Sequence, residues 1–334
     1  MKAVMLLSGG LDSLLAARVL LDQGIELEAL NFVTLFCNCT PKSRCCSSAA
    51  SAVQQLGISL KVINNTQDFL KVVQAPAHGY GSNLNPCIDC RILMFRKAAD
   101  YMRETGASFI VTGEVLGERP MSQRREAMTL IEREAGLEGL IVRPLSAANL
   151  EPSIPEQRGW IDRGKLLGIR GRSRKPQIAL AASYGLKDYP CPAGGCLLTD
   201  PIFAARMRDL MQHQPGFALP DVLLLKLGRH LRLTDEAKVI VGRDQPENER
   251  LKSLAREGDE LLEAVDVPGP LSLLRGRIGV VERLVAAKVT LIYGKARGRA
   301  KTKVRVSSHR GEILEEKSVA PLDAAEAEGM RIGG

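Results

Sequence analysis

The chain has 334 residues, of which 45% are hydrophobic and 25% are charged. A compact domain usually has about 100–150 residues, so this length accommodates two domains and excludes a mini-protein scaffold. The composition excludes global disorder and a fibrous protein. No apolar run approaches the ~20 residues of a membrane helix, and the first residues lead into a strand pattern rather than a signal peptide. We therefore expect a cytoplasmic protein with no membrane partner.

The predicted elements alternate between strand and helix through the N-terminal half. This alternation predicts an α/β fold in which a parallel sheet is covered by helices. Strands are expected at 2–7, 27–36, 60–64, 109–112 and 140–142, and helices at 13–22, 48–55, 92–101 and 126–133. Prolines and glycines break the next stretch into short elements, and a helix is expected at 203–211.

The composition changes after about residue 200. From about residue 221 the segments become short, alternating and punctuated by glycine and proline, which predicts a smaller, strand-rich α+β domain. We therefore expect one domain over 1–210 and a second over 221–334.

A glycine pair lies between the first predicted strand and the first predicted helix, where positions 8–13 read S-G-G-L-D-S. Two glycines let backbone N–H groups turn toward an anion, and the N-terminus of the following helix adds positive potential. Asp12 would then be an N-cap or a carboxylate ligand of Mg²⁺. A plain glycine turn with an aspartate cap is the alternative on spacing alone.

The S-G-G-L-D-S motif resembles the signature of the PP-loop ATP pyrophosphatases, which lack the Walker lysine, as this sequence does. That family cleaves ATP between the α- and β-phosphates and adenylates a substrate oxygen. The resemblance implies that ATP and Mg²⁺ bind here. It also implies that pyrophosphate is held by Ser8, Gly9, Gly10, Asp12 and Ser13.

Three cysteines are candidates for a second centre. Cys87 and Cys90 form a C-x-x-C pair at a predicted helix start, where we expect the helix N-terminus to lower the pKa of the thiols. Such a pair alone is compatible with zinc, an iron–sulfur cluster, a redox pair or no function. A third thiol is available at Cys196, whose two preceding glycines allow the backbone to approach a bulky inorganic group. Cys191 is the rival for that third position.

This layout is similar to that of the iron–sulfur-dependent tRNA thiolases, PP-loop enzymes that carry a C-x-x-C in mid-domain and one further cysteine late in the catalytic domain. The resemblance implies that Cys87, Cys90 and Cys196 bind a [4Fe-4S] cluster with one iron open to sulfide. Two further motifs, T-G-E with Gly113 at its centre and R-P-L-S at 143–146, follow predicted strands where the family places loops that face nucleotide and substrate.

The implied reaction is ATP-dependent tRNA sulfur transfer, in which a uridine carbonyl oxygen is adenylated and then replaced by sulfur. The resemblance leaves open which uridine is modified and whether the change is at C2 or C4. The sulfur donor is also open among inorganic sulfide, a cysteine desulfurase and a sulfur carrier, and a homodimer is an alternative to a monomer. Two other functions compete: a PP-loop sulfur transferase that acts on a small molecule, and a non-catalytic RNA-binding protein with a vestigial PP-loop domain.

A second group of cysteines follows the second predicted strand in the pattern C-x-C-x5-C-C. A Zn²⁺ site, a sulfur relay and a set of exposed thiols are all compatible with it. A four-thiolate zinc site is disfavoured because two adjacent cysteines would have to share one ion. The group consists of Cys37, Cys39, Cys45 and Cys46.

Positive charge is concentrated in two stretches without acidic residues, within a chain whose formal net charge is +8. In the second stretch a basic residue occupies every second position, so on a strand all would project from one face. A charged edge strand is one interpretation, and a surface that follows RNA phosphates is the other. The RNA-binding candidates are Arg170, Arg172, Arg174 and Lys175 in the first stretch, and Lys295, Arg297, Arg299, Lys301, Lys303 and Arg305 in the second.

The C-terminal region carries a further resemblance. G-R-H at 228–230, A-K-V-I-V-G-R at 237–243 and V-D-V-P-G at 265–269 together resemble the NFACT-R-type domain that contacts RNA in ribosome-quality-control factors. The resemblance covers roughly residues 225–306 and implies an RNA partner.

Overall fold

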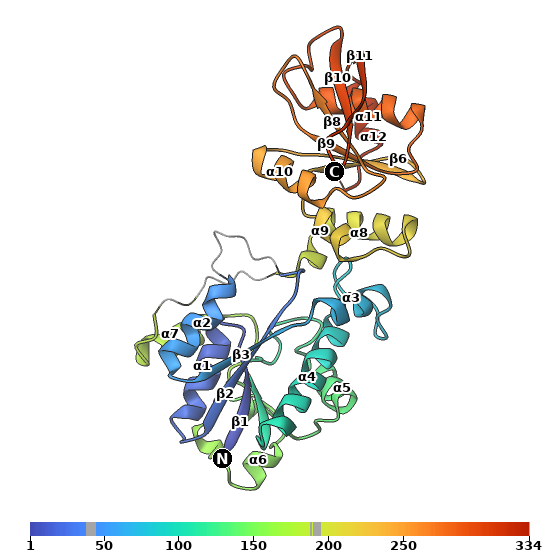
Figure 1. Cartoon of the computed structure of the whole chain (residues 1–334). Coiled ribbons are helices and arrows are strands. Elements are labelled where there is room, and N and C mark those ends of the chain that lie inside the picture. The colour runs from blue at the N-terminus through green and yellow to red at the C-terminus, as the bar shows by residue number, and fades with distance from the viewer. Residues whose placement is uncertain (38–44, 188, 190–194, 334) are drawn as a thin grey trace. The chain divides into compact units, whose positions relative to one another are not determined.

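The computed structural model describes residues 1–37, 45–187, 189 and 195–333. The chain divides into two compact units, Met1–Leu197 and Leu198–Gly334 (Figure 1). The division therefore comes earlier than the expected end of the first domain at residue 210. The helix α8 (Pro201–His213) belongs to the second unit because its Asp209 binds Arg232 of that unit through two hydrogen bonds, of 2.9 Å and 2.5 Å.

The first unit contains a five-stranded parallel sheet, as the alternating pattern predicts. Its strand order is β3-β2-β1-β4-β5, so β1 lies at the centre. The buried run of β1 is apolar throughout because helices cover both faces of the sheet. The strands are β1 (Lys2–Leu6), β2 (Glu26–Val33), β3 (Ser59–Asn64), β4 (Phe109–Thr112) and β5 (Ile141–Val142).

Helices form a layer on each side of this sheet (Figure 1). One apolar core includes Leu14, Ala52 and Ala181, from the three helices on one side, and a second includes Phe95 and Ile131, from two helices on the other. The first layer has α1 (Leu11–Leu21), α2 (Cys45–Leu56) and α7 (Lys175–Ser183), and the second has α4 (Cys87–Glu104) and α5 (Arg125–Ala135). Smaller elements are α3 (Thr66–Gln74), α6 (Ile154–Gln157), η1 (Ala147–Asn149) and η2 (Arg163–Lys165).

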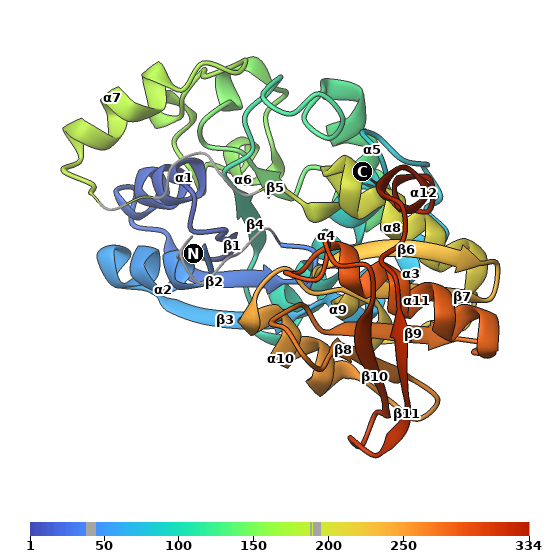
Figure 2. The same cartoon turned by 90° about the horizontal axis from the view of Figure 1, so that it is seen from above.

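The second unit is the expected smaller α+β domain. Its six-stranded antiparallel sheet has the order β11-β10-β8-β9-β7-β6, and β10 and β11 form an extended hairpin (Figure 2). The strands are β6 (Arg229–Thr234), β7 (Ala237–Val241), β8 (Glu260–Ala264), β9 (Ser272–Gly276), β10 (Thr302–Ser308) and β11 (Ile313–Val319). The other elements are η3 (Leu197–Thr199) at the junction, α9 (Leu219–Leu224), α10 (Gln245–Leu254), α11 (Val280–Ile292) and α12 (Ala324–Gly329).

Two apolar cores stabilise the second unit. Ala286 and Val289 of α11 pack with one set of strand residues, whereas Leu224 of α9 and Leu251 of α10 pack with another. The sheet is thus covered by helices on both faces. Within the described ranges, no helix is long and apolar enough to cross a membrane.

Candidate functional site

The strand order of the first unit reverses between β1 and β4. In open parallel sheets, ligands bind beyond the carboxyl ends of the strands at such a reversal. The S-G-G-L-D-S segment follows β1, and Gly113 follows β4. A Cβ atom on Gly113 would lie 2.5 Å from the backbone N of Ser13 and 2.6 Å from the backbone C of Asp12. Glycine at 113 therefore lets the two loops meet at the position where a nucleotide is expected.

The geometry of the loop suits an anion. Gly9 has φ +79°, and a Cβ atom there would lie 2.5 Å from the backbone N of Ala49, so this position requires glycine. Ser13 Oγ donates to the carbonyl of Gly10 at 2.9 Å and lies 3.2 Å from Ser8 Oγ. The N–H groups of the first turn of α1 have no intrahelical acceptors and lie at the positive end of the helix. These features make the loop a cradle for phosphate oxygens.

Asp12 is the second residue of α1, and the N-cap of the helix is Gly10. The N-cap interpretation of Asp12 is therefore wrong. Burial raises the pKa of the Asp12 carboxyl, and the guanidinium groups of Arg174 and Arg119 partly oppose that rise. Oδ1 of Asp12 is buried without a hydrogen-bond partner among the described residues. The carboxylate is thus free to bind a cation.

A buried amide and a second carboxylate accompany Asp12. Gln177 of α7 is fully buried, and its side-chain amide lies close enough to the Asp12 carboxyl to lower the pKa of that group. The pKa of Glu118 is raised by burial and by the charge of Asp12. Two neighbouring carboxylates combined with substrate phosphates are a usual Mg²⁺ environment. Sequence analysis missed Glu118 and Gln177 because neither belongs to a motif.

The segment that carries Glu118 is held against the first basic stretch. Leu116 and Arg170 form an isolated parallel bridge, and Gly171 N–H donates to the carbonyl of Leu116 at 2.7 Å. This pairing brings Arg174 toward the phosphate loop, where its charge acts on Asp12 and Glu118. Arg170, Arg172 and Lys175 are exposed.

The C-x-x-C pair occupies the first turn of α4, which begins at Cys87. Burial raises the pKa of the Cys87 thiol, and it raises the pKa of Cys90 to about 12. The expected lowering by the helix N-terminus is therefore wrong, because loss of solvent outweighs the helix dipole and the favourable charge of Arg91. In the absence of a metal, these thiols are protonated at neutral pH.

Cys196 is the third thiol that the resemblance implied, and its place beside this pair stays a prediction. Burial is the main cause of the raised pKa of Cys90, and the charges of Cys196, Cys87 and Cys37 raise it further. The backbones of Cys37 and Cys196 form an isolated antiparallel bridge, and Leu197 N–H donates to the carbonyl of Phe36 at 2.8 Å. Cys37 therefore lies beside Cys196.

The remaining cysteines lie outside what the structure describes. Cys39 and Cys191 are among the residues that are not described, and so are the side chains of Cys45 and Cys46. Within the described ranges, no three His, Cys, Asp or Glu side chains converge on a single metal ion. A Zn²⁺ site at the second cysteine group stays a prediction, as does the choice between Cys191 and Cys196.

Arg119 links the loop to the thiols. Its guanidinium lowers the pKa of Asp12, Glu118 and Cys87, so it lies near both groups. The phosphate loop and the cysteines therefore adjoin in one candidate site at the carboxyl edge of the sheet. Arg119 is exposed and belongs to no recognisable motif, so only the fold reveals its position.

The second basic stretch differs from the sequence expectation. Strand β10 begins at Thr302, so residues 295–301 precede it and do not share a strand face with Lys303 and Arg305. Lys303 and Arg305 lie 3.7 Å and 2.8 Å from Glu316 of β11, which partly neutralises them. The alternating pattern is interrupted because 294–300 folds as turns and loop.

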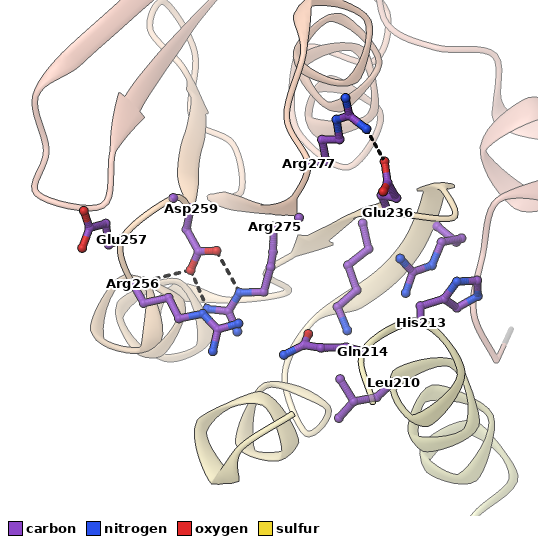
Figure 3. Close-up of a pocket in the computed structure, with 13 residues that line it drawn as sticks. Leu210, His213, Gln214, Glu236, Arg256, Glu257, Asp259, Arg275 and Arg277 are labelled. Atoms are coloured by element: carbon purple, nitrogen blue, oxygen red, sulfur yellow. Dashed lines mark hydrogen bonds and ion pairs between the residues drawn. The ribbon is translucent and has the colours of Figure 1, made fainter. Parts of the chain in front are cut away.

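A polar cavity of about 460 Å³ lies in the second unit (Figure 3). Arg275 in its wall is buried and binds Asp221 at 2.8 Å and Asp259 at 2.5 Å. Lys238 is also buried, 4.0 Å from Asp209, and burial lowers its pKa to about 8. The cations of this cavity are paired with carboxylates, so its charge is largely balanced.

The two units of the chain match two different known protein families. Residues 1–154 match the family described as thiamine biosynthesis protein (ThiI), and residues 228–330 match the NFACT protein RNA-binding domain. The chain is 36% identical over 117 residues to tRNA-specific 2-thiouridylase MnmA of Helicobacter acinonychis, which covers 34% of each chain. It is 29% identical over 136 residues to a probable tRNA sulfurtransferase of Methanosarcina mazei, which covers 35% of this chain and 29% of that one.

The chain thus spans about a third of the length of the curated relatives it matches. Among solved structures, a 4-thiouridine synthetase–RNA complex with bound ATP matches 67% of this chain and 52% of that chain, at 23% identity and a TM-score of 0.38. The U34-tRNA thiolase NcsA from Methanococcus maripaludis with its [4Fe-4S] cluster matches 67% and 70%, at 16% identity and a TM-score of 0.34. The motifs and the two family matches thus make the first unit similar to PP-loop tRNA thiolases and the second unit similar to the NFACT protein RNA-binding domain.

Proposed function

We propose that this protein is an ATP-dependent tRNA sulfurtransferase. The observation that carries the proposal is that the charge of Arg119 acts on both Asp12 of the phosphate loop and the half-buried thiol of Cys87. An amide-forming PP-loop enzyme has no use for such thiols. The two relatives, which are named as a tRNA 2-thiouridylase and a probable tRNA sulfurtransferase, and the NFACT-type domain support tRNA as the acceptor.

The first half of the reaction uses the phosphate loop. The N–H groups of the loop and the N-terminus of α1 bind the β- and γ-phosphates, while Asp12 and Glu118 hold Mg²⁺. Arg174 and Arg119 offset the charge that develops on pyrophosphate as the uridine oxygen attacks the α-phosphorus. Pyrophosphate leaves, and the oxygen becomes part of an adenylate that can depart as AMP.

The second half uses the thiols. A donor set composed of thiols suits an iron–sulfur cluster, whose irons are held by cysteine thiolates. Cys87, Cys90 and Cys196 would hold such a cluster, and when bound it supplies sulfur at an iron without a protein ligand.

Two variants separate the halves of this reaction. With tRNA and ATP, Asp12→Asn is expected to lose both pyrophosphate release and thionucleoside formation. Cys87→Ser is expected to release pyrophosphate but to form no thionucleoside, as measured by mass spectrometry of digested tRNA. Lys71→Ala, on the exposed surface of α3, is the control and should retain both activities. Thionucleoside formation by Cys87→Ser would contradict the role of the thiols, and a lack of any tRNA-dependent pyrophosphate release by the wild type would contradict the enzyme.

A further inference from the structure

Three basic residues form a row across the sheet of the second unit. Lys238 on β7 lies directly opposite Arg232 on β6 and directly opposite Arg275 on β9. Directly paired residues of neighbouring antiparallel strands place their Cβ atoms about 4.5–5.5 Å apart on one face, and like charges in such positions repel each other. All three residues also line the polar cavity of this unit. The row therefore needs acidic partners, and the structure supplies them unequally.

The two outer cations of the row are held by carboxylates. Arg232 donates two hydrogen bonds to Asp209 of α8, at 2.9 Å and 2.5 Å. Arg275 donates to both oxygens of Asp259, at 2.8 Å and 2.5 Å, and to Asp221 at 2.8 Å. These pairs account for most of the charge balance of the cavity.

Lys238, in the middle of the row, is the exception. It is 4% exposed and lies in the wall of the cavity shown in Figure 3. It forms no hydrogen bond within the described ranges, and its acidic neighbour there, Asp209, is 4.0 Å away and already accepts from Arg232. A buried ammonium without an acceptor is costly, and burial accordingly lowers the pKa of Lys238 to about 8. A charged side chain in this state beside a cavity is typical of a ligand site.

We propose that this cavity binds a phosphate group, and that the Lys238 ammonium is its principal donor. An ammonium offers three N–H groups to phosphate oxygens, and Nη1 of Arg232, which forms no hydrogen bond within the described residues, is available beside it. The cavity volume of about 460 Å³ lies in the range of small-molecule sites, so it admits a nucleotide and not only its phosphate. The match of residues 228–330 to an RNA-binding domain favours phosphate over a carboxylate. The inference goes beyond sulfur transfer, because it uses no feature of the first unit.

The phosphate can belong to a free nucleotide or to RNA. Because Lys238 is buried, the backbone of a rigid duplex does not reach its ammonium. An RNA ligand would instead insert a single-stranded or terminal nucleotide into the cavity. The two sources are distinguished by two arms of one experiment.

The first arm measures urea unfolding of the full chain at pH 7 as inorganic phosphate replaces chloride at constant ionic strength. It compares wild type with Lys238→Met and with Lys252→Met, whose lysine is exposed on α10. Phosphate stabilises folded proteins in general, and any binding to the phosphate loop is common to all three proteins. Wild type and Lys252→Met should show a further rise in the unfolding midpoint of the second unit that grows with phosphate concentration, whereas Lys238→Met should lack it.

The second arm measures the affinity of the same three proteins for tRNA at one salt concentration without phosphate. Loss of the phosphate response together with about tenfold weaker tRNA binding by Lys238→Met, the scale of one hydrogen-bonded charge, would support the site and identify RNA as the source. Loss of the phosphate response with unchanged tRNA affinity would support the site and identify a free phosphate compound.

Two results would overturn the proposal. One is an equal phosphate response of wild type and Lys238→Met, whatever the affinity for tRNA. The other is loss of the response in Lys252→Met as well, because the effect would then not belong to the cavity. Neither arm uses ATP or the thiols, so such a failure would leave the sulfurtransferase proposal in place.

Discussion

The Nε atom of Arg91 lies 3.3 Å from Oε1 of Glu114. The other oxygen of this buried carboxylate accepts a hydrogen bond from Arg143 Nε at 3.0 Å. Arg91 follows Cys90 directly on α4, and its charge lowers the pKa of both Cys87 and Cys90. Glu114 and Arg143 belong to the two motifs, T-G-E and R-P-L-S, that we expected in nucleotide- and substrate-facing loops. The Glu114 carboxylate, itself held by Arg143, therefore holds the Arg91 cation beside the thiols.

Replacement of Glu114 by Gln should strongly destabilise the first unit. It keeps the volume but leaves the buried guanidinium of Arg143 with Glu132 as its only acidic partner among the described residues. Breaking a buried pair costs about 3 kcal/mol or more of the free energy of unfolding. Urea unfolding monitored by the fluorescence of Trp160, the only tryptophan, measures this change. The control is Glu126→Gln, whose side chain is exposed at the start of α5, and an equal effect of both variants would contradict the role of the buried ion pair.

The fold was largely predictable because its signals are local. Four of the five strands of the first unit end within one residue of their expected ends, since apolar runs between glycine turns define them. The exception is β2, which ends at Val33 rather than 36 because the chain turns there toward Cys37. The helix α3 was missed because only Phe69 and Val73 give it an apolar face.

The site was less predictable because its members come from separate loops. The motif residues Asp12 and Cys87 could be named from local spacing. Arg119 and Glu118 could not, since their role depends on the loop that follows β4 and on its bridge to Arg170. The shift in the pKa of the thiols was predicted in the wrong direction. The sequence indicates a helix start and therefore its dipole, but it does not show that Cys90 loses contact with solvent.

Arg174 should be required for pyrophosphate release rather than for binding of tRNA. Its charge acts on Asp12 and Glu118, so Arg174→Ala removes a cation from the phosphate site. We expect pyrophosphate release to fall by about 10²-fold, the usual scale for one electrostatic group in a preorganised site. The next residue provides the control, because exposed Lys175→Ala should change the rate less than threefold. If Arg174→Ala or Lys175→Ala lowers tRNA affinity more than it lowers the rate of pyrophosphate release, that residue is an RNA contact.

The buried positive charge of Lys238 should lower the free energy of unfolding of the second unit at neutral pH. Burial lowers its pKa from 10.5 to about 8, which corresponds to at most about 3 kcal/mol against the charged form. Below pH 8 both the folded and the unfolded state carry the proton, so the full cost is present. Between pH 8 and 10.5 the folded state releases the proton first, and the cost shrinks as the pH rises.

The variant Lys238→Met should therefore raise the free energy of unfolding by about 1–3 kcal/mol at pH 7, and this gain should vanish near pH 10.5. Urea unfolding followed by far-ultraviolet circular dichroism measures both values. Lys252→Met provides the control, because that side chain is exposed and lies on α10. If Lys238→Met raises the free energy of unfolding by the same amount at every pH, the buried charge of Lys238 is not the cause of the increase.

The loop before β10 should contribute more to RNA affinity than β10 itself. Its four basic side chains are exposed and form no ion pair among the described residues, whereas Lys303 and Arg305 share Glu316. Each phosphate contact adds about 0.7–0.9 to the slope of log affinity against log salt concentration. Replacement of the four residues by Gln should therefore lower the magnitude of that slope by up to about 3, measured by tRNA binding at several salt concentrations. The paired control, Lys303→Gln with Arg305→Gln, should lower it by less than about 1, and the reverse order would place the RNA on the strand. The four residues are Lys295, Arg297, Arg299 and Lys301.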